Sequence, residues 1–163
     1  MKLAIHRAKS GFSDRWIAYC EEQGIPYKSV DCYHTDIIEH LSDCDALLWH
    51  HNHAYPVDQL IAKPLLFSLE QAGKVVFPDF KTTWHYDDKL GQKYLFEALN
   101  LPAVRSYVFF TKREARNWTK NTEFPVVFKL RRGAGSRNVF LVKNKSQAVK
   151  LIRKAFGRGF RQY

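Results

Sequence analysis

The first 80 residues alternate short apolar runs with segments of helical periodicity, and this alternation constrains the fold more than any other feature of the sequence. Apolar runs at residues 2–6, 27–32, 45–51 and 74–78 predict four strands, and the segments 14–23, 35–41 and 57–72 predict helices. The run at 45–51 is apolar on both faces, as a central parallel strand requires. The pattern therefore predicts an α/β fold with a doubly wound parallel sheet.

Residues 81–163 follow a different pattern. They predict helices at 87–99, 112–119 and 146–156, a strand after Pro102, and a hairpin with arms at 126–130 and 138–142. This order is typical of a small α+β unit with an antiparallel sheet. Ser13 and Asp87 are the expected N-caps of the helices that follow them. We therefore predict two domains, residues 1–80 and residues 81–163.

The charge of the chain is distributed unevenly between these two parts. Residues 1–80 contain 7 Lys and Arg against 11 Asp and Glu, whereas residues 81–163 contain 19 against 5, within a net charge of +10. A strongly basic half favours an acidic ligand, which would be either a polyphosphate or a nucleic acid.

The remaining composition excludes several classes of protein. No apolar run approaches the roughly 20 residues that a membrane span needs, and MKLAIHRAKSG at the N-terminus lacks the apolar core of a secretory signal. The three cysteines, Cys20, Cys32 and Cys44, are too sparse for a disulfide framework and contain no CxxC pair. We expect free thiols, a cytoplasmic protein and no membrane partner.

The hairpin sequence FPVVFKLRRGAGSRNVFLV, residues 124–142, has the composition of an anion site. A lysine ends an apolar strand, and the glycines that follow allow backbone N–H groups to turn toward one anion. The chain contains no Walker A sequence, and the loop leads into a strand, which excludes a dinucleotide fingerprint. A flap over phosphates and an ordinary solvated basic hairpin both fit this pattern. The residues expected to hold an anion are Lys129, Arg131, Gly133, Gly135 and Ser136.

The segment DDKLGQKYLFEALNLPAVRSYVF, followed by FPVVFKLRRGAGSRNVFLV, resembles the ATP-grasp family. In that family a lysine after an aspartate begins a helix, a Leu-Pro turn and a strand follow, and a P-V-x-x-K strand leads into a loop of small residues and a second strand. All of these parts occur here in the same order. The resemblance implies a Rossmann-like pre-ATP-grasp domain in residues 1–80 and an incomplete ATP-grasp domain, its small nucleotide-binding lobe, in residues 81–163.

The resemblance also implies a ligand and an activity. Lys89 and Lys129 would hold the phosphates of ATP beneath the loop of Gly133, Gly135 and Ser136. The implied reaction is ATP-dependent ligation, in which a carboxylate is activated as an acyl phosphate and captured by an amine or a similar nucleophile. The half of the family fold that supplies the Mg²⁺ ligands has no counterpart in the sequence. We therefore expect an N-terminal fragment of an enzyme, with little or no turnover by itself.

Three histidines, His50, His51 and His53, follow at the end of the run at 45–51, where open parallel sheets bind ligands. Contact with an acceptor substrate, metal binding and an ordinary polar loop are all open for them. No metal site is assigned, because adjacent strand residues point to opposite faces. The loop AKSGFSD at 8–14 is a further candidate for ligand contact. Asp87 and Asp88 are interpreted as helix-cap and helix-dipole partners.

A non-enzymatic alternative is a nucleic-acid or polyanion binder that uses the basic half of the chain. The tail KLIRKAFGRGFR carries cations together with Phe156 and Phe160, which could stack on bases. Helical spacing gives a plainer account, in which Val149, Ile152 and Phe156 face the core. No RNA-binding or zinc-finger signature is present, so nucleic acid is not the expected ligand. A regulatory module that keeps the fold without the chemistry is a third alternative, and a homo-oligomer is left open.

Overall fold

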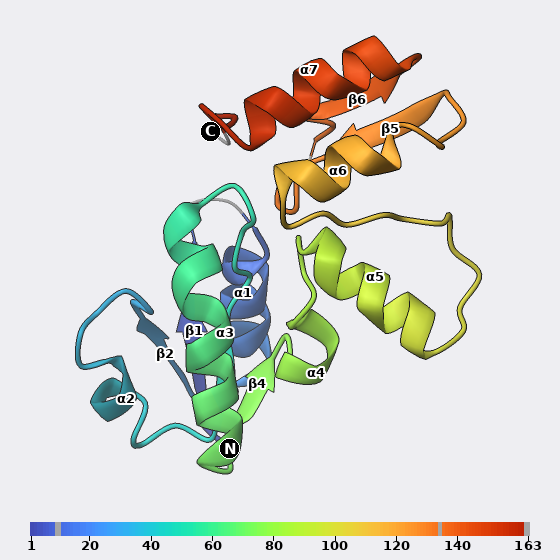
Figure 1. The fold of residues 1–163 in the computed structure, drawn as a ribbon. Coiled ribbons are helices and arrows are strands. Elements are labelled where there is room, and N and C mark those ends of the chain that lie inside the picture. The colour runs from blue at the N-terminus through green and yellow to red at the C-terminus, as the bar shows by residue number, and fades with distance from the viewer. Residues whose placement is uncertain (9–10, 134, 162–163) are drawn as a thin grey trace. The chain divides into compact units, whose positions relative to one another are not determined.

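The computed structural model describes residues 1–8, 11–133 and 135–161, and the chain divides into two compact units, Met1–Tyr86 and Asp87–Tyr163 (Figure 1). The sequence placed the boundary between residues 80 and 81. The short helix α4 (Phe80–Thr83) accounts for the difference, because it packs on the first unit. The Phe80 ring lies 5.1 Å from the Phe67 ring, and the Phe80 N–H donates to Glu70 Oε1 at 2.7 Å.

The first unit is built on a four-stranded parallel sheet with the order β2-β1-β3-β4, as the sequence predicted. Its strands are β1 (Leu3–His6), β2 (Tyr27–Val30), β3 (Ala46–Leu48) and β4 (Val75–Phe77). Its other helices are α1 (Ser13–Gln23), α2 (Ile37–His40) and α3 (Pro56–Gln71). The order of strands and helices makes this an α/β unit with crossover connections between parallel neighbours.

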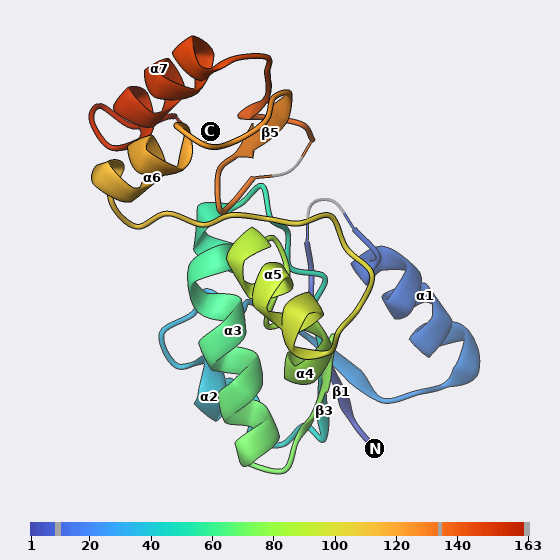
Figure 2. The ribbon, with the colours of Figure 1, turned by 45° about the vertical axis from the view of Figure 1, so that its right-hand side comes forward.

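Helices cover both faces of this sheet, because successive strand residues point to opposite sides. Leu3 and Ile5 of β1 belong to one hydrophobic cluster, which includes Cys20 of α1. Ala4 belongs to the other cluster, which includes Leu66 of α3. Figure 2 shows α1 on one side of the sheet and α3 on the other. The doubly wound arrangement expected from the sequence is therefore confirmed.

The second unit contains the predicted hairpin, with β5 (Val126–Lys129) antiparallel to β6 (Val139–Val142). Its helices are α5 (Lys89–Ala98), α6 (Lys112–Trp118) and α7 (Lys145–Ala155). The buried apolar side chains of this unit are few, and they belong to α6, β6 and α7: Ala115, Val142, Ala148 and Ile152. The α+β character predicted for the second half of the chain is confirmed.

Two local predictions were wrong. The strand expected after Pro102 does not form, because β5 and β6 pair only with each other in the described part of the chain and offer no third partner. Val104 in that segment is 92% exposed. Ser13 does not cap α1: Phe12 occupies the N-cap position, and the Ser13 hydroxyl instead bonds the backbone N–H and C=O of Ala8.

The three cysteines are free and buried, as expected. Among the described residues, no helix has the length and apolar content that crossing a membrane requires.

Candidate functional site

The start of α5 is fixed by a side-chain cap. Asp88 Oδ1 accepts hydrogen bonds from the backbone N–H groups of Leu90 and Gly91, both at 3.1 Å. The N-cap is therefore Asp88, and the prediction of Asp87 at this position was wrong by one residue. The cap makes Lys89 the first residue of α5, which is where the sequence resemblance placed it.

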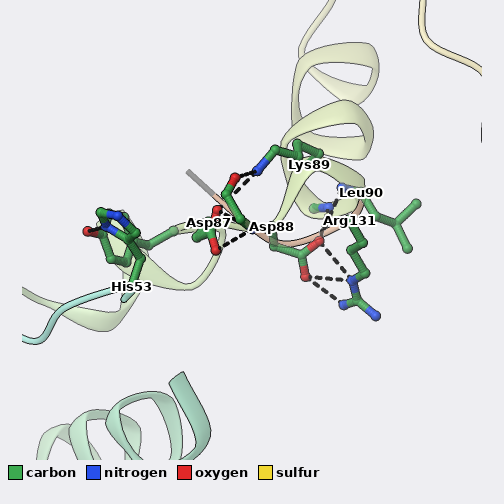
Figure 3. Close-up of polar contacts among 9 residues, drawn as sticks. His53, Asp87, Asp88, Lys89, Leu90 and Arg131 are labelled. Carbon is green, nitrogen blue, oxygen red and sulfur yellow. Dashed lines mark hydrogen bonds and ion pairs between the residues drawn. The ribbon is translucent and has the colours of Figure 1, made fainter. Parts of the chain in front are cut away.

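Asp88 also holds the hairpin through Arg131. The Arg131 Nε lies 3.0 and 3.1 Å from the two Asp88 oxygens, and Nη2 donates to Oδ2 at 2.5 Å (Figure 3). The backbone adds a second tie, since the Lys89 N–H donates to the Arg131 carbonyl at 3.0 Å. Hydrogen bonding to Arg131, supported by the helix cap, lowers the pKa of Asp88 to about 2.

Asp87 forms a different set of contacts. Its Oδ1 accepts from Lys89 Nζ at 3.0 Å, and its two oxygens lie 3.0 and 2.8 Å from the Gly133 backbone nitrogen (Figure 3). Lys89 Nζ also donates to the Gly133 carbonyl at 2.5 Å. The Asp87 side chain is only 5% exposed. An ammonium group and a backbone N–H thus converge on one buried carboxylate.

The backbone around these contacts is unusual. Asp87 has a φ of +50°, a region that residues with a Cβ rarely adopt. The hairpin loop follows the same pattern, with positive φ at Gly133, Gly135, Ser136 and Asn138. Residues in this conformation turn consecutive N–H groups toward one side, which is how backbone nests for anions are built. Ala134 of this loop lies outside the described residues.

Two predicted site residues stand apart from this contact set. Lys129 and Ser136 are exposed, and neither side chain hydrogen-bonds any residue that the structure describes. Lys129 lies opposite Val139 in the hairpin and shares its face with the exposed Val127. The structure therefore brings together Lys89, Arg131 and Gly133, whereas Lys129, Ser136 and the exposed Gly135 lie outside this set of contacts.

These groups have the chemistry of an anion site. The carboxylate of Asp87 shows that the Lys89 ammonium and the Gly133 N–H can bind one negatively charged group at the same time. Arg131 keeps 59% of its side chain exposed although it is paired with Asp88. The donor set therefore fits a phosphate, which is recognised by backbone N–H groups and fixed cations.

The histidines at the end of β3 lie in the first unit and make different contacts from one another. His53 Nδ1 lies 2.9 Å from the Tyr86 hydroxyl (Figure 3). His51 is buried, and neither of its ring nitrogens has a hydrogen-bond partner among the described residues. Burial lowers the pKa of His51 below its ordinary value. Among the residues that the structure describes, no group of three or more His, Cys, Asp or Glu could hold a metal ion.

The loop AKSGFSD contains Lys9 and Ser10, which lie outside the described residues. Its described part approaches His50: a Cβ added to Gly11 would lie 2.2 Å from the His50 Nδ1, so only glycine fits there. The Phe12 ring lies 4.7 Å from the His50 ring. This contact gives His50 a packing role.

The contacts of two buried carboxylates were missed in the sequence. Asp87 was interpreted as a cap, and the only signal for another role was the pair of adjacent aspartates before the lysine. Asp58, 2% exposed, accepts from the Tyr33 hydroxyl and from the Asn52 N–H, both at 2.5 Å. A carboxylate in the first turn of a helix is normally interpreted as a partner of the helix dipole, so this pairing could not be predicted from the sequence.

The sequence matches no family model and no curated protein. Several solved structures have a similar fold. One is the biotin carboxylase domain dimer of the 2-oxoglutarate carboxylase of Hydrogenobacter thermophilus, determined in complex with MgADP, ADP and bicarbonate. It is 18% identical, with a TM-score of 0.68 over 97% of this chain and 42% of that chain.

Two further structures have similar scores. A RimK-domain ATP-grasp protein from Sphaerobacter thermophilus is 16% identical, with a TM-score of 0.68 over 96% of this chain and 60% of that chain. N5-carboxyaminoimidazole ribonucleotide synthetase from Thermus thermophilus is 16% identical, with a TM-score of 0.66 over 99% of this chain and 47% of that chain. The chain thus spans 42% to 60% of the length of these three structures, and the likeness confirms the predicted ATP-grasp type of fold.

Proposed function

We propose that this chain binds the phosphates of ATP between the start of α5 and the β5–β6 loop, as part of an ATP-dependent carboxylate ligase. The observation that supports the proposal most directly is the convergence of Lys89 Nζ and the Gly133 N–H on one anionic group. The fold shared with a carboxylase and a synthetase supports the general kind of activity. The residues assigned to the phosphates are Lys89, Lys129, Arg131, Gly133, Gly135 and Ser136.

Each residue has a role that follows from its place in the fold. Lys89 is held at the first turn of α5, and Lys129 is carried by the end of β5, so both offer charges at fixed positions. Gly133 and Gly135 offer backbone N–H groups, and Ser136 offers a hydroxyl. Bound ATP would supply the phosphoryl group that activates a carboxylate for capture by an amine or a similar nucleophile. The residues of this chain would orient the phosphates and balance their charge.

Magnesium belongs to the proposal as the ion that accompanies ATP, and a neighbouring structure contains MgADP. The described residues contain no cluster suited to a metal ion, so the proposal assigns no Mg²⁺ ligand to them. Mg²⁺ would neutralise part of the triphosphate charge. The Hydrogenobacter thermophilus domain was determined as a dimer. Analytical ultracentrifugation would test whether this chain also forms a homo-oligomer.

Calorimetric titration of the 163-residue chain with ATP, with and without Mg²⁺, tests the site. We expect Lys129→Ala to weaken binding by about tenfold, the equivalent of about 1.4 kcal/mol, because a fixed cation near the phosphates is lost. Lys150→Ala is the matched control, because Lys150 is an exposed lysine of α7 and should change little. Equal affinity of Lys129→Ala and the unaltered chain would contradict the proposal.

The nucleic-acid alternative is tested by the same chain in a salt titration. Its binding should weaken steeply with salt and should tolerate the loss of any one lysine. One structural observation argues against it: the half-buried Phe160 ring packs 5.5 Å from the Phe128 ring and 5.8 Å from the Phe140 ring, so part of its surface is already covered. The core position expected for Phe156 was wrong, because its side chain is 40% exposed. We therefore favour the nucleotide.

A further inference from the structure

The carboxylate of Asp87 occupies the place that the proposed function gives to a phosphate. We propose that Asp87 is an internal competitor for the site: its carboxylate holds the Lys89 ammonium and the Gly133 N–H, and a phosphate binds there only by displacing it. The inference rests on the proposed function for the identity of the ligand. It adds an autoinhibitory contact that sets how tightly that ligand binds.

The donors at this point are limited in number. Gly133 has a single N–H, and both Asp87 oxygens lie within 3.0 Å of its nitrogen. A phosphate oxygen cannot use this donor while the carboxylate remains. Lys89 has three N–H donors, of which Asp87 Oδ1 and the Gly133 carbonyl take two. The ligand therefore competes for Gly133 completely and for Lys89 in part.

Charge reinforces this competition. The Lys89 ammonium and the Asp87 carboxylate are 3.0 Å apart, so the pair carries no net charge. A phosphate that approaches the pair is attracted by the Lys89 ammonium and repelled by the Asp87 carboxylate. The repulsion is strengthened because the Asp87 side chain is buried. Removal of the carboxylate charge should therefore improve anion binding even though it removes a native contact.

Neither the α5 cap nor the pair with Arg131 explains the conformation of Asp87. The α5 cap and the contact with Arg131 belong to Asp88, so Asp87 is not needed to begin the helix. Its backbone holds a positive φ of +50°, which Asp adopts more readily than most residues with a Cβ but which is still uncommon. Such conformations persist where surrounding contacts hold them, often at functional sites. Here those contacts are the ones made by its carboxylate.

Asp87→Asn is the sharpest test, because asparagine keeps the size of the side chain and is well tolerated at positive φ. The probes are inorganic tripolyphosphate and ATP, titrated by calorimetry into the 163-residue chain. We expect Asp87→Asn to bind tripolyphosphate about tenfold more tightly than the unaltered chain, since loss of one charge-assisted contact corresponds to about that factor. Glu97→Gln removes one charge near the other end of the same helix, and we expect it to leave affinity unchanged.

A second measurement follows the contact itself. Amide hydrogen exchange at Gly133, measured by NMR, should be faster in Asp87→Asn than in the unaltered chain, and tripolyphosphate should restore its protection. Tripolyphosphate binding that is unchanged, weaker or absent in Asp87→Asn would overturn the inference, as would an equal gain in Glu97→Gln. ATP binding that depends on Lys129 but is not tightened by Asp87→Asn would refute the competitor and leave the proposed function standing. Tighter tripolyphosphate binding by Asp87→Asn, with no ATP binding, would support the competitor and refute the proposed function.

Discussion

One buried polar site in the first unit and one in the second are held in opposite ways. At the carboxyl ends of the strands in the first unit, His51 is buried without a ring hydrogen bond to any described residue, beside the fully buried Trp49. At the start of α5 in the second unit, Asp87 and Asp88 are also buried, but every carboxylate oxygen accepts at least one hydrogen bond. The first site is dominated by aromatic packing and the second by charge-assisted contacts.

The difference shows where each unit obtains its stability. The first unit has two hydrophobic clusters, and each fully buried large apolar side chain contributes about 1.5–3 kcal/mol, enough to offset an unpaired imidazole that costs about 1–3 kcal/mol. The second unit buries few apolar side chains. Its hairpin and its helix α5 are therefore held together largely by the contacts of Asp88, Arg131 and Asp87.

The largest effect should come from the aromatic core of the first unit. We expect Trp49→Ala to destabilise the chain by about 4 kcal/mol, because it removes a fully buried ring and leaves a cavity. Hydrogen exchange with mass spectrometry should show the loss of protection in peptides of Met1–Tyr86. Leu60→Ala is the control, since Leu60 is 73% exposed on α3 and should cost less than about 0.5 kcal/mol. Equal loss of protection in Asp87–Tyr163 would break the distinction between the units.

The second unit should respond most to its charged contacts. We expect Asp88→Ala to cost about 2 kcal/mol, about 1 from the lost helix cap and about 1 from the pair with Arg131, whose side chain is more than half exposed. Peptides from α5 and the hairpin should lose protection first. Glu97→Ala, which breaks an exposed pair with Lys93 on the same helix, should cost less than about 0.5 kcal/mol and serves as the control.

The contact between Asp88 and Arg131 also predicts that the second unit loses stability in acid. The pKa of Asp88 falls from 3.8 to about 2 in the folded chain, so the folded state favours the ionised form. Its contribution to stability is therefore fully present above about pH 4 and is lost as the pH falls toward 2. In Asp88→Ala this part of the acid dependence should disappear from the unfolding curves.

Much of the fold could be predicted from the sequence because most segments with a strand pattern pair with a neighbouring strand. The four parallel strands and the β5–β6 hairpin carry apolar runs bounded by turn residues, and they occur within a few residues of the predicted positions. The segment after Pro102 has the same local pattern but finds no neighbour to pair with. Strand formation depends on a second chain segment, and a local pattern does not contain that information.

The candidate site was harder to predict, because its contacts cross 43 to 46 residues of sequence. Lys89 was found through its place after an aspartate, and Gly133 through the composition of the loop. The role of Asp87 could not be found in this way, because a carboxylate before a helix has the same pattern whether it caps or holds a distant loop. Only the fold distinguishes the two aspartates.

The smallest predicted effect is a difference between the two units in how their stability depends on pH. All seven histidines lie in residues 1–86, and burial lowers the pKa of both His6 and His51. The folded chain favours the neutral rings more than the unfolded chain does, so the unfolded chain binds more protons below the ordinary pKa of 6.5. The first unit should therefore keep its full stability above about pH 6.5 and lose part of it as the pH falls below that value.

His51→Phe tests this directly, because it removes the titrating ring nitrogens and keeps the aromatic contact with Trp49. Asp58 raises the pKa of His51, whereas His50 and Lys63 lower it, and burial is the largest influence. We expect the variant to show a smaller stability change between pH 7 and 5 in Met1–Tyr86 than the unaltered chain, while Asp87–Tyr163 shows no change over that range. His40→Gln, at an exposed site, should behave like the unaltered chain. An undiminished pH dependence in His51→Phe would mean that the unpartnered imidazole is not what distinguishes the first unit from the second.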